Sequence, residues 1–177
     1  GDYASSMLSY TKAEQLIDKI DDEFIKGLLY AQLGMLHQKY YDYPRSLDAF
    51  NTAAEHYELA GKTAHKYFAK LNIGQVYQEL KDYTIAEDLL SEVMSWSYEN
   101  NYVQLCQEAL EFLITLYDET DQETKIASIT NSIYADYCGS SLQMIQIRAF
   151  ELSKQNNASS INMLNEADGQ LRHSVDT

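Results

Sequence analysis

Side chains that could carry out chemistry are few, and they form no known constellation. No two histidines have the His-Glu-x-x-His spacing that places two imidazoles on one helix face around a zinc ion. They are scattered along the chain, at His37, His56, His65 and His173. The histidines therefore predict neither a catalytic site nor a metal site.

The two cysteines, Cys106 and Cys138, are equally poor candidates for chemistry. They fit no zinc spacing and no disulfide-rich framework. Neither has an adjacent histidine or lysine that would stabilise a thiolate. We expect two unreacted, mostly buried thiols. A disulfide between them remains the alternative, because the helices that carry them are expected to lie antiparallel.

The acidic run at residues 118–123 is similar to a calcium-binding loop only in composition. It lacks the central glycine and the twelve-residue ligand spacing of an EF-hand. We therefore expect a solvated turn between two helices. No glycine-rich phosphate-binding loop occurs in the sequence either. Together these patterns predict a protein with no catalytic residues, no bound metal and no cofactor.

The overall charge restricts the class of partner. The formal net charge is −14 and the isoelectric point is about 4.5, so the surface repels phosphate backbones and anionic membranes. No apolar run approaches the roughly 20 residues that span a bilayer. We expect no direct nucleic-acid binding and no membrane insertion by this segment. The compartment stays open, cytoplasmic or extracytoplasmic.

The elements that must position these side chains are helices related by a repeat. One proline and seven glycines leave few places to interrupt a helix. Residues of similar type recur 40 positions apart, as in Leu33-Gly34 and Ile73-Gly74, Asp42-Tyr43 and Asp82-Tyr83, and Phe50 and Leu90. The same step backwards from Asp42-Tyr43 reaches Asp2-Tyr3. Such a period is typical of solenoids built from helix pairs.

This unit resembles the tetratricopeptide repeat (TPR). In that family an A helix with apolar, small and aromatic residues leads through an Asp-Tyr turn into a B helix. The clearest copy here has Ile73, Gly74, Tyr77, Asp82, Tyr83, Ala86, Leu90 and Val93 at the matching positions. In the preceding copy His37 occupies the aromatic position, which indicates a packing role. The third copy is degenerate, with Gln122-Glu123 in place of Asp-Tyr. The resemblance covers about residues 2–137, and the 40-residue, tyrosine-rich units are similar to those of bacterial regulatory proteins.

The resemblance implies an all-α fold, an α-solenoid of antiparallel TPR helix pairs. We expect helices at 4–20, 22–39, 44–60, 63–80, 84–99, 102–118, 122–137, 140–155 and 159–172. Residues 1–138 would form the array, a half repeat followed by three A/B helix pairs with the third degenerate. Residues 139–177 would form C-terminal capping helices. Because the array starts in mid-repeat, we expect a piece of a longer protein.

The chemistry of single residues supports this arrangement. Gly34 and Gly74 lie in mid-helix, where glycine costs up to ~1 kcal/mol relative to alanine. We expect close approach of the partner helix, at Ser46 or Ala86, as the compensation. The aspartates of the two Asp-Tyr pairs should cap the B helices, and Pro44 suits a first helical turn. Turns between repeats are expected at Gly61, Asn100-Asn101, Gly139 and Asn156-Asn157.

In TPR proteins the A helices line a concave groove. Carried onto this chain, that register selects residues spaced three and four apart, on one face of each A helix. These are Leu28, Ala31, Gln32, Met35 and Lys39 in the first helix, Phe68, Leu71, Asn72, Gln75 and Glu79 in the second, and Glu108, Glu111, Phe112, Thr115 and Glu119 in the third. The alternative is that these stripes pack on neighbouring helices or face solvent. Only Asn72 matches the residues with which some TPR proteins clamp a partner's carboxylates.

The resemblance implies a non-catalytic scaffold that binds a protein or peptide, as part of a larger regulatory or sensor protein. The predicted groove changes from apolar at Met35 to acidic at Glu108 and Glu111, which favours a neutral-to-basic, partly apolar partner. The alternative is a structural element that forms homo-oligomers through the ends of the array. Mass measurements across a concentration range distinguish the two.

Overall fold

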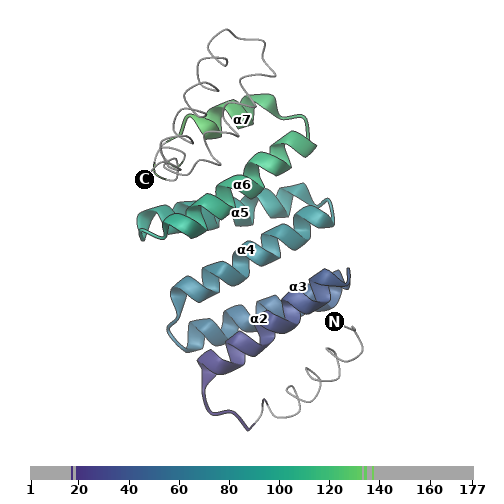
Figure 1. Ribbon diagram of the computed structural model, residues 1–177, viewed down its shortest axis with the longest axis vertical. Helices are drawn as coiled ribbons and strands as arrows, with labels where there is room; N and C mark the ends of the chain where they lie inside the picture. Colours follow the sequence, from purple (N-terminus) through teal and green to yellow (C-terminus); the bar gives the residue numbers. More distant parts are fainter. Residues whose placement is uncertain (1–16, 18, 133, 135–136, 138–177) are drawn as a thin grey trace, which may run out of the picture. The chain divides into compact units, whose positions relative to one another are not determined.

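The computed structural model describes residues 17, 19–132, 134 and 137, and its described elements are all helices. Six helices, α2 to α7, follow one another without a strand in this part of the chain (Figure 1). Their bounds are Glu23–Lys39, Tyr43–Leu59, Thr63–Glu79, Tyr83–Glu99, Val103–Glu119 and Glu123–Thr130. The first five agree with the expected helices to within one residue at each end. No helix in the described residues is long and apolar enough to cross a membrane.

Several expectations fall elsewhere in the chain. The expected helices at 140–155 and 159–172, most of the one at 4–20, and the boundary between residues 138 and 139 lie outside the described residues. The chain divides into two compact units, Gly1–Val93 and Met94–Thr177, with the division inside α5. In the first unit α2 packs on α3, α3 packs on α4, and α2 also touches α4. In the second unit α6 packs on α7.

Consecutive helices are joined by one kind of turn, which recurs every 20 residues. A residue with φ between 55° and 66° follows each of the helices α2 to α6, at Tyr41, Gly61, Lys81, Asn101 and Asp121. After α2, the amide of Tyr41 donates to the Gln38 carbonyl and that of Asp42 to the His37 carbonyl, both at 2.9 Å. This is the Schellman motif, which satisfies the last carbonyls of a helix. The turns at Gly61 and Asn101 were expected, whereas the left-handed Tyr41, Lys81 and Asp121 were not.

Two aspartates cap helix starts in the first unit. The Asp42 carboxylate accepts from the Arg45 amide at 3.4 Å at the start of α3, as expected, and Pro44 lies in that first turn. The Asp22 carboxylate accepts from the amides of Phe24 and Ile25 at 2.9 and 3.2 Å, a cap the repeat did not predict. Each cap satisfies amides that have no partner within the helix.

Glycines allow close helix contacts, as the repeat predicted. The Ser46 hydroxyl donates to the Gly34 carbonyl at 2.9 Å, so α3 approaches α2 at the expected position. A Cβ on Gly34 would lie 2.6 Å from the Phe50 ring. A Cβ on Gly74 would lie 3.0 Å from Leu90, which occupies the position equivalent to Phe50 in the preceding repeat. Ala86, the equivalent of Ser46, is fully buried.

Among the described residues of the first unit, two clusters of buried side chains lie between the helices. Phe50, Ile73 and Val76 form one, flanked by the partly buried Tyr43, Leu47, Tyr77 and Leu89. Ala53, Tyr57 and Ala69 form the other, flanked by Phe24, Tyr30, Ala31 and Ala54. In the second cluster two alanines pack beside the Tyr57 ring, which lets the helices come close. The core positions the A-helix faces that the sequence assigned to a groove.

In the second unit, α6 carries the largest share of buried residues and α7 is shorter than expected. Eight side chains of α6 are buried: Leu105, Cys106, Ala109, Leu110, Leu113, Ile114, Leu116 and Tyr117. The helix expected at 122–137 ends in the structure at Thr130. Thr130, Asn131 and Ser132 each bond back to a carbonyl of the preceding turn, at 2.8, 2.8 and 2.6 Å. Asn131 and Ser132 leave the helical conformation, whereas residues 134 and 137 are helical.

Candidate functional site

The predicted groove residues of α2 form a solvent-facing stripe. Leu28 is 39% exposed and Met35 is 42% exposed, and Gln32 and Lys39 are exposed as well. Ala31 lies at the edge of the stripe and is half-buried. Because aliphatic side chains this exposed lie at helical spacing on one face, they form a continuous surface that a ligand could cover.

The predicted residues of α4 are less uniform. Phe68, Asn72 and Gln75 are half-buried, and Glu79 is exposed. Leu71 is only 3% exposed and belongs to the core, so its side chain offers no surface to a ligand. The Asn72 amide donates to the Phe68 carbonyl of its own helix at 2.7 Å. This bond leaves the carbonyl oxygen of Asn72 as an acceptor.

An open hollow of about 600 Å³ lies between α2 and α4. Its lining includes five of the predicted groove residues, Met35, Lys39, Asn72, Gln75 and Glu79. Three further residues complete it: Gln38, Tyr41 and Tyr43. The volume is within the range of small-ligand sites, ~300–1,000 Å³. All eight residues belong to the first unit.

The Glu79 carboxylate is the centre of hydrogen bonding in this hollow. Gln38 of α2 donates to it at 2.9 Å, and Gln75 donates at 3.5 Å. Loss of solvent contact raises the pKa of Tyr43, and the nearby Glu79 carboxylate raises it further. The phenol therefore stays protonated at neutral pH.

Comparisons with solved structures show the fold. The structure entitled "Crystal Structure of the Apo Form of RapI" matches with a TM-score of 0.80 and 14% sequence identity. BtubC (BKLC) from P. vanneervenii matches with a TM-score of 0.80 and 12% identity. Each match covers 99% of this chain, which spans 66% of the RapI chain and 75% of the BtubC chain. The fold is a TPR-like helical repeat. No protein-family model matches the sequence, and no match among curated proteins was found by sequence comparison.

In this TPR-like fold the acidic residues predicted for the groove lie on α6, in the second unit. Glu108 and Glu111 are half-buried and accept hydrogen bonds from Gln104 and Gln107 of the same helix, each at 3.0 Å. Phe112 is half-buried, and Thr115 and Glu119 are exposed. Their hydrogen bonds to neutral amides run along α6. The predicted change from apolar to acidic along the groove stays a prediction.

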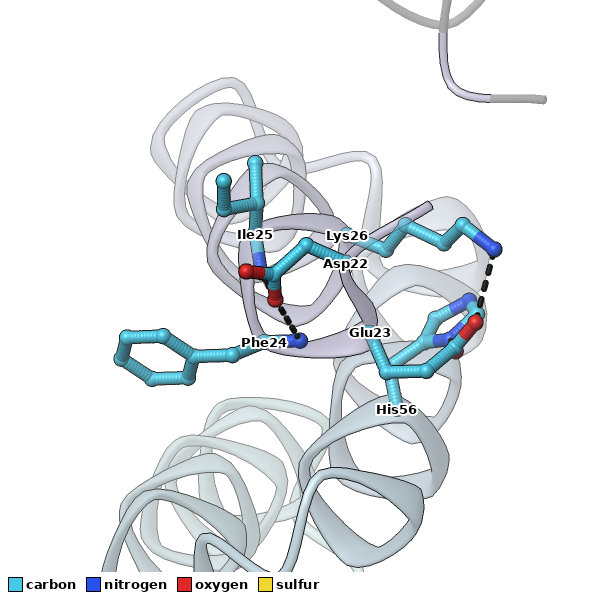
Figure 2. Close-up of polar contacts among 6 residues, drawn as sticks. All are labelled: Asp22, Glu23, Phe24, Ile25, Lys26 and His56. Carbon is cyan, nitrogen blue, oxygen red and sulfur yellow. Dashed lines mark hydrogen bonds and ion pairs between the residues drawn. The ribbon is translucent and has the colours of Figure 1, made fainter. Parts of the chain in front are cut away.

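A second polar cluster joins the start of α2 to α3. The Glu23 carboxylate contacts Lys26 Nζ at 2.8 Å and His56 Nδ1 at 2.5 Å, and Figure 2 shows Phe24 pointing to the opposite side. The His56 ring stacks on Tyr30, with centroids 5.4 Å apart. The bond with Lys26 and then the bond with His56 lower the pKa of Glu23. The imidazole is held between a carboxylate and a ring, so this cluster fastens α2 to α3.

Two residues with reactive side chains are buried in the described part of the chain. His37 is 7% exposed, as the packing role predicted, and its Nδ1 lies 3.8 Å from the Asp42 carboxylate. Cys106 is fully buried, as expected of a structural thiol. Cys138, its expected neighbour, lies outside the described residues.

Sequence reasoning missed three residues of the hollow. Gln38 is outside the groove register, Tyr41 belongs to a turn that no glycine marks, and Tyr43 was assigned only to the Asp-Tyr turn motif. The available signal was the repeat itself, because Lys39 and Glu79 occupy equivalent positions 40 residues apart. Residues near the same helix ends can therefore contact the charged side chains of Lys39 and Glu79.

Proposed function

We propose that this chain is a non-catalytic binding scaffold, whose α2–α4 face holds an extended segment of a partner protein. One observation carries the proposal. The hollow between α2 and α4 is lined by Met35, Lys39, Asn72 and Gln75, which the repeat register had assigned to a ligand-facing groove. Two independent lines of argument, sequence register and surface shape, thus select the same face.

The chemistry of this face suits a peptide better than a small substrate. Exposed aliphatic side chains at Leu28 and Met35 would contact apolar side chains of the partner. The amides of Asn72 and Gln75 are groups that can bond to a peptide backbone. We propose the sensing or regulatory part of a larger protein as the role, which the style of the repeats supports.

The test uses the 177-residue chain and labelled, end-blocked peptides of about ten residues, which span roughly 33 Å when extended. Members of the set differ in apolar content and charge. We expect partly apolar peptides to bind and to perturb NMR signals of α2 and α4 around Met35 and Asn72. Signals from the exposed side of α3, at Asn51 and Glu55, should stay unchanged.

Variants then connect binding to the face. Met35→Asp should weaken binding, whereas Glu55→Gln on α3 should leave it unchanged. Met35 is 42% exposed, so its replacement should alter stability by less than about 0.5 kcal/mol. Perturbations centred elsewhere, or no binding by any peptide, would refute the proposal. A mass that rises with protein concentration would favour the self-assembly alternative.

A further inference from the structure

The arrangement around Glu79 is unusual for a surface carboxylate. The amides of Gln38 and Gln75 donate to it, and the Tyr43 hydroxyl lies close enough for the Glu79 carboxylate to raise the pKa of Tyr43. Neutral donors orient a carboxylate without cancelling its charge. Since Gln38, Tyr43 and Gln75 belong to α2, α3 and α4, the packing of three helices surrounds the carboxylate with neutral polar groups. Glu79 nevertheless remains exposed.

No cation of the described residues forms an ion pair with Glu79. The ion pairs of the first unit engage Glu23, Asp42, Glu58 and Glu92. Lys39 lines the same hollow and occupies the position equivalent to Glu79 in the preceding repeat, but its ammonium is not within 4 Å of an acidic group in that part of the chain. The hollow thus contains an oriented carboxylate that no internal cation neutralises.

The place of this carboxylate in the fold also favours a cation. The bond between Gln38 and Glu79 joins the last turns of α2 and α4, so two helix C-termini meet at the hollow. The C-terminal end of a helix carries a partial negative charge. The last turn of α4 contains no basic residue that would offset it.

The other wall of the hollow is apolar and aromatic. Tyr41 is 77% exposed, and its ring meets that of Tyr43 edge-on with centroids 6.2 Å apart. The left-handed conformation of Tyr41 and its Schellman hydrogen bond hold its backbone in the turn. Met35 lines the hollow as well. An aliphatic stem can lie along such a wall, and the ring faces attract a cation at its end.

We propose that the hollow between α2 and α4 receives a lysine or arginine side chain from an extended segment of the partner protein, with its cation on Glu79 and its stem against Met35, Tyr41 and Tyr43. This rests on the proposed function and specifies the chemistry of the partner. The positive charge of Lys39 repels the basic side chain of the partner and limits the affinity of the partner segment for the hollow. The exposed Lys39 side chain can turn away into solvent.

The test compares two probes that differ in one side chain. Both are end-blocked peptides of about ten residues in which leucine and serine alternate around one central position. One carries arginine there and the other carries citrulline, which has nearly the same shape and no charge. Fluorescence anisotropy with the 177-residue chain should show binding about three- to tenfold tighter for the arginine peptide.

Four variants determine where the preference arises. Glu79→Gln should remove the preference for the arginine peptide and leave the affinity for the citrulline peptide unchanged. Lys39→Gln should increase the preference for the arginine peptide. Glu79→Lys should favour a third probe with a central glutamate. The matched control is Glu55→Gln, which removes the same charge from an exposed site on α3, and it should keep the preference for arginine.

The outcomes separate the inference from the proposed function. If citrulline and arginine peptides bind the α2–α4 face equally well, or Glu79→Gln keeps the preference, the inference is wrong and the scaffold proposal stands. If Glu55→Gln loses the preference for arginine as fully as Glu79→Gln does, the preference comes from the overall negative charge of the protein. That result would also overturn the inference. If none of the three probes binds, both proposals fail. Thermal melts of the variants monitor folding, and the reversal in Glu79→Lys tests the site without depending on a loss of binding.

Discussion

At the scale of single residues, glycine determines how closely the helices of the first unit approach. Gly27 faces the Tyr57 ring and Gly34 faces the Phe50 ring, where an added Cβ would lie 2.7 and 2.6 Å from ring atoms. Both rings are almost fully buried and have no room to move. The packing of α2 against α3 therefore requires that Gly27 and Gly34 carry no Cβ.

We expect Gly34→Ala to destabilise the protein, although alanine favours helices by ~1 kcal/mol over glycine. Overpacking of a buried ring costs about 1–3 kcal/mol, and this term should prevail. Denaturant unfolding of the wild type, Gly34→Ala, Phe50→Leu and the double variant forms a complete cycle. Because leucine lacks the ring that the new methyl group meets, the cost of Gly34→Ala should fall in the Phe50→Leu background. An equal cost in both backgrounds would contradict the contact.

At the scale of elements, the turn that ends each of the helices α2 to α6 is the most regular feature of the described residues. The same left-handed conformation recurs at Gly61, which suits it, and at Tyr41 and Lys81, where the side chain has a steric cost. Asn101 and Asp121 are intermediate, because asparagine and aspartate tolerate this conformation better than most residues. The spacing of the helices therefore determines where the turn occurs. The residue type at the left-handed position changes only the free energy of the turn.

Reciprocal substitutions test this interpretation. Gly61→Ala should destabilise by about 1 kcal/mol, because alanine is strained at a φ of 66° and no neighbour within 4 Å of the new Cβ would compensate. Lys81→Gly should stabilise, by less than that amount, since glycine also gains freedom in the unfolded chain. The two free energies of unfolding are measured in denaturant. If both substitutions change stability in the same direction, conformational strain does not control the turn.

At the scale of the whole molecule, the net charge of −14 produces a field that attracts basic partners from a distance. This effect acts on the rate of encounter, whereas Glu79 acts within the complex. The association rate of the central-arginine peptide should fall with added salt more steeply than that of the citrulline peptide, because the screening length shrinks from ~10 Å at 0.1 M to ~3 Å at 1 M. Stopped-flow fluorescence measures both rates, and an equal salt dependence would contradict long-range attraction.

The positions of the helices were determined by the sequence itself. Capping at Asp42 and Pro44 in a first turn are local signals, which act through hydrogen bonds or steric contacts within a few residues. The 40-residue recurrence of small and aromatic residues adds the spacing of the elements, so the bounds of α2 to α6 were predicted to within one residue. The end of α7 at Thr130 was not predicted, because the helical periodicity of the sequence continues past it.

Only the tertiary structure decided how these helices meet. Whether Leu71 faces a groove or the core depends on the rotation of one helix against the next. The hollow depends on it as well, because Gln38, Tyr43 and Glu79 come from three different helices and meet only when these pack. A repeat determines which residues are equivalent. Side-chain volumes at the contacts determine the rotation, and with it the side chains that surround the carboxylate.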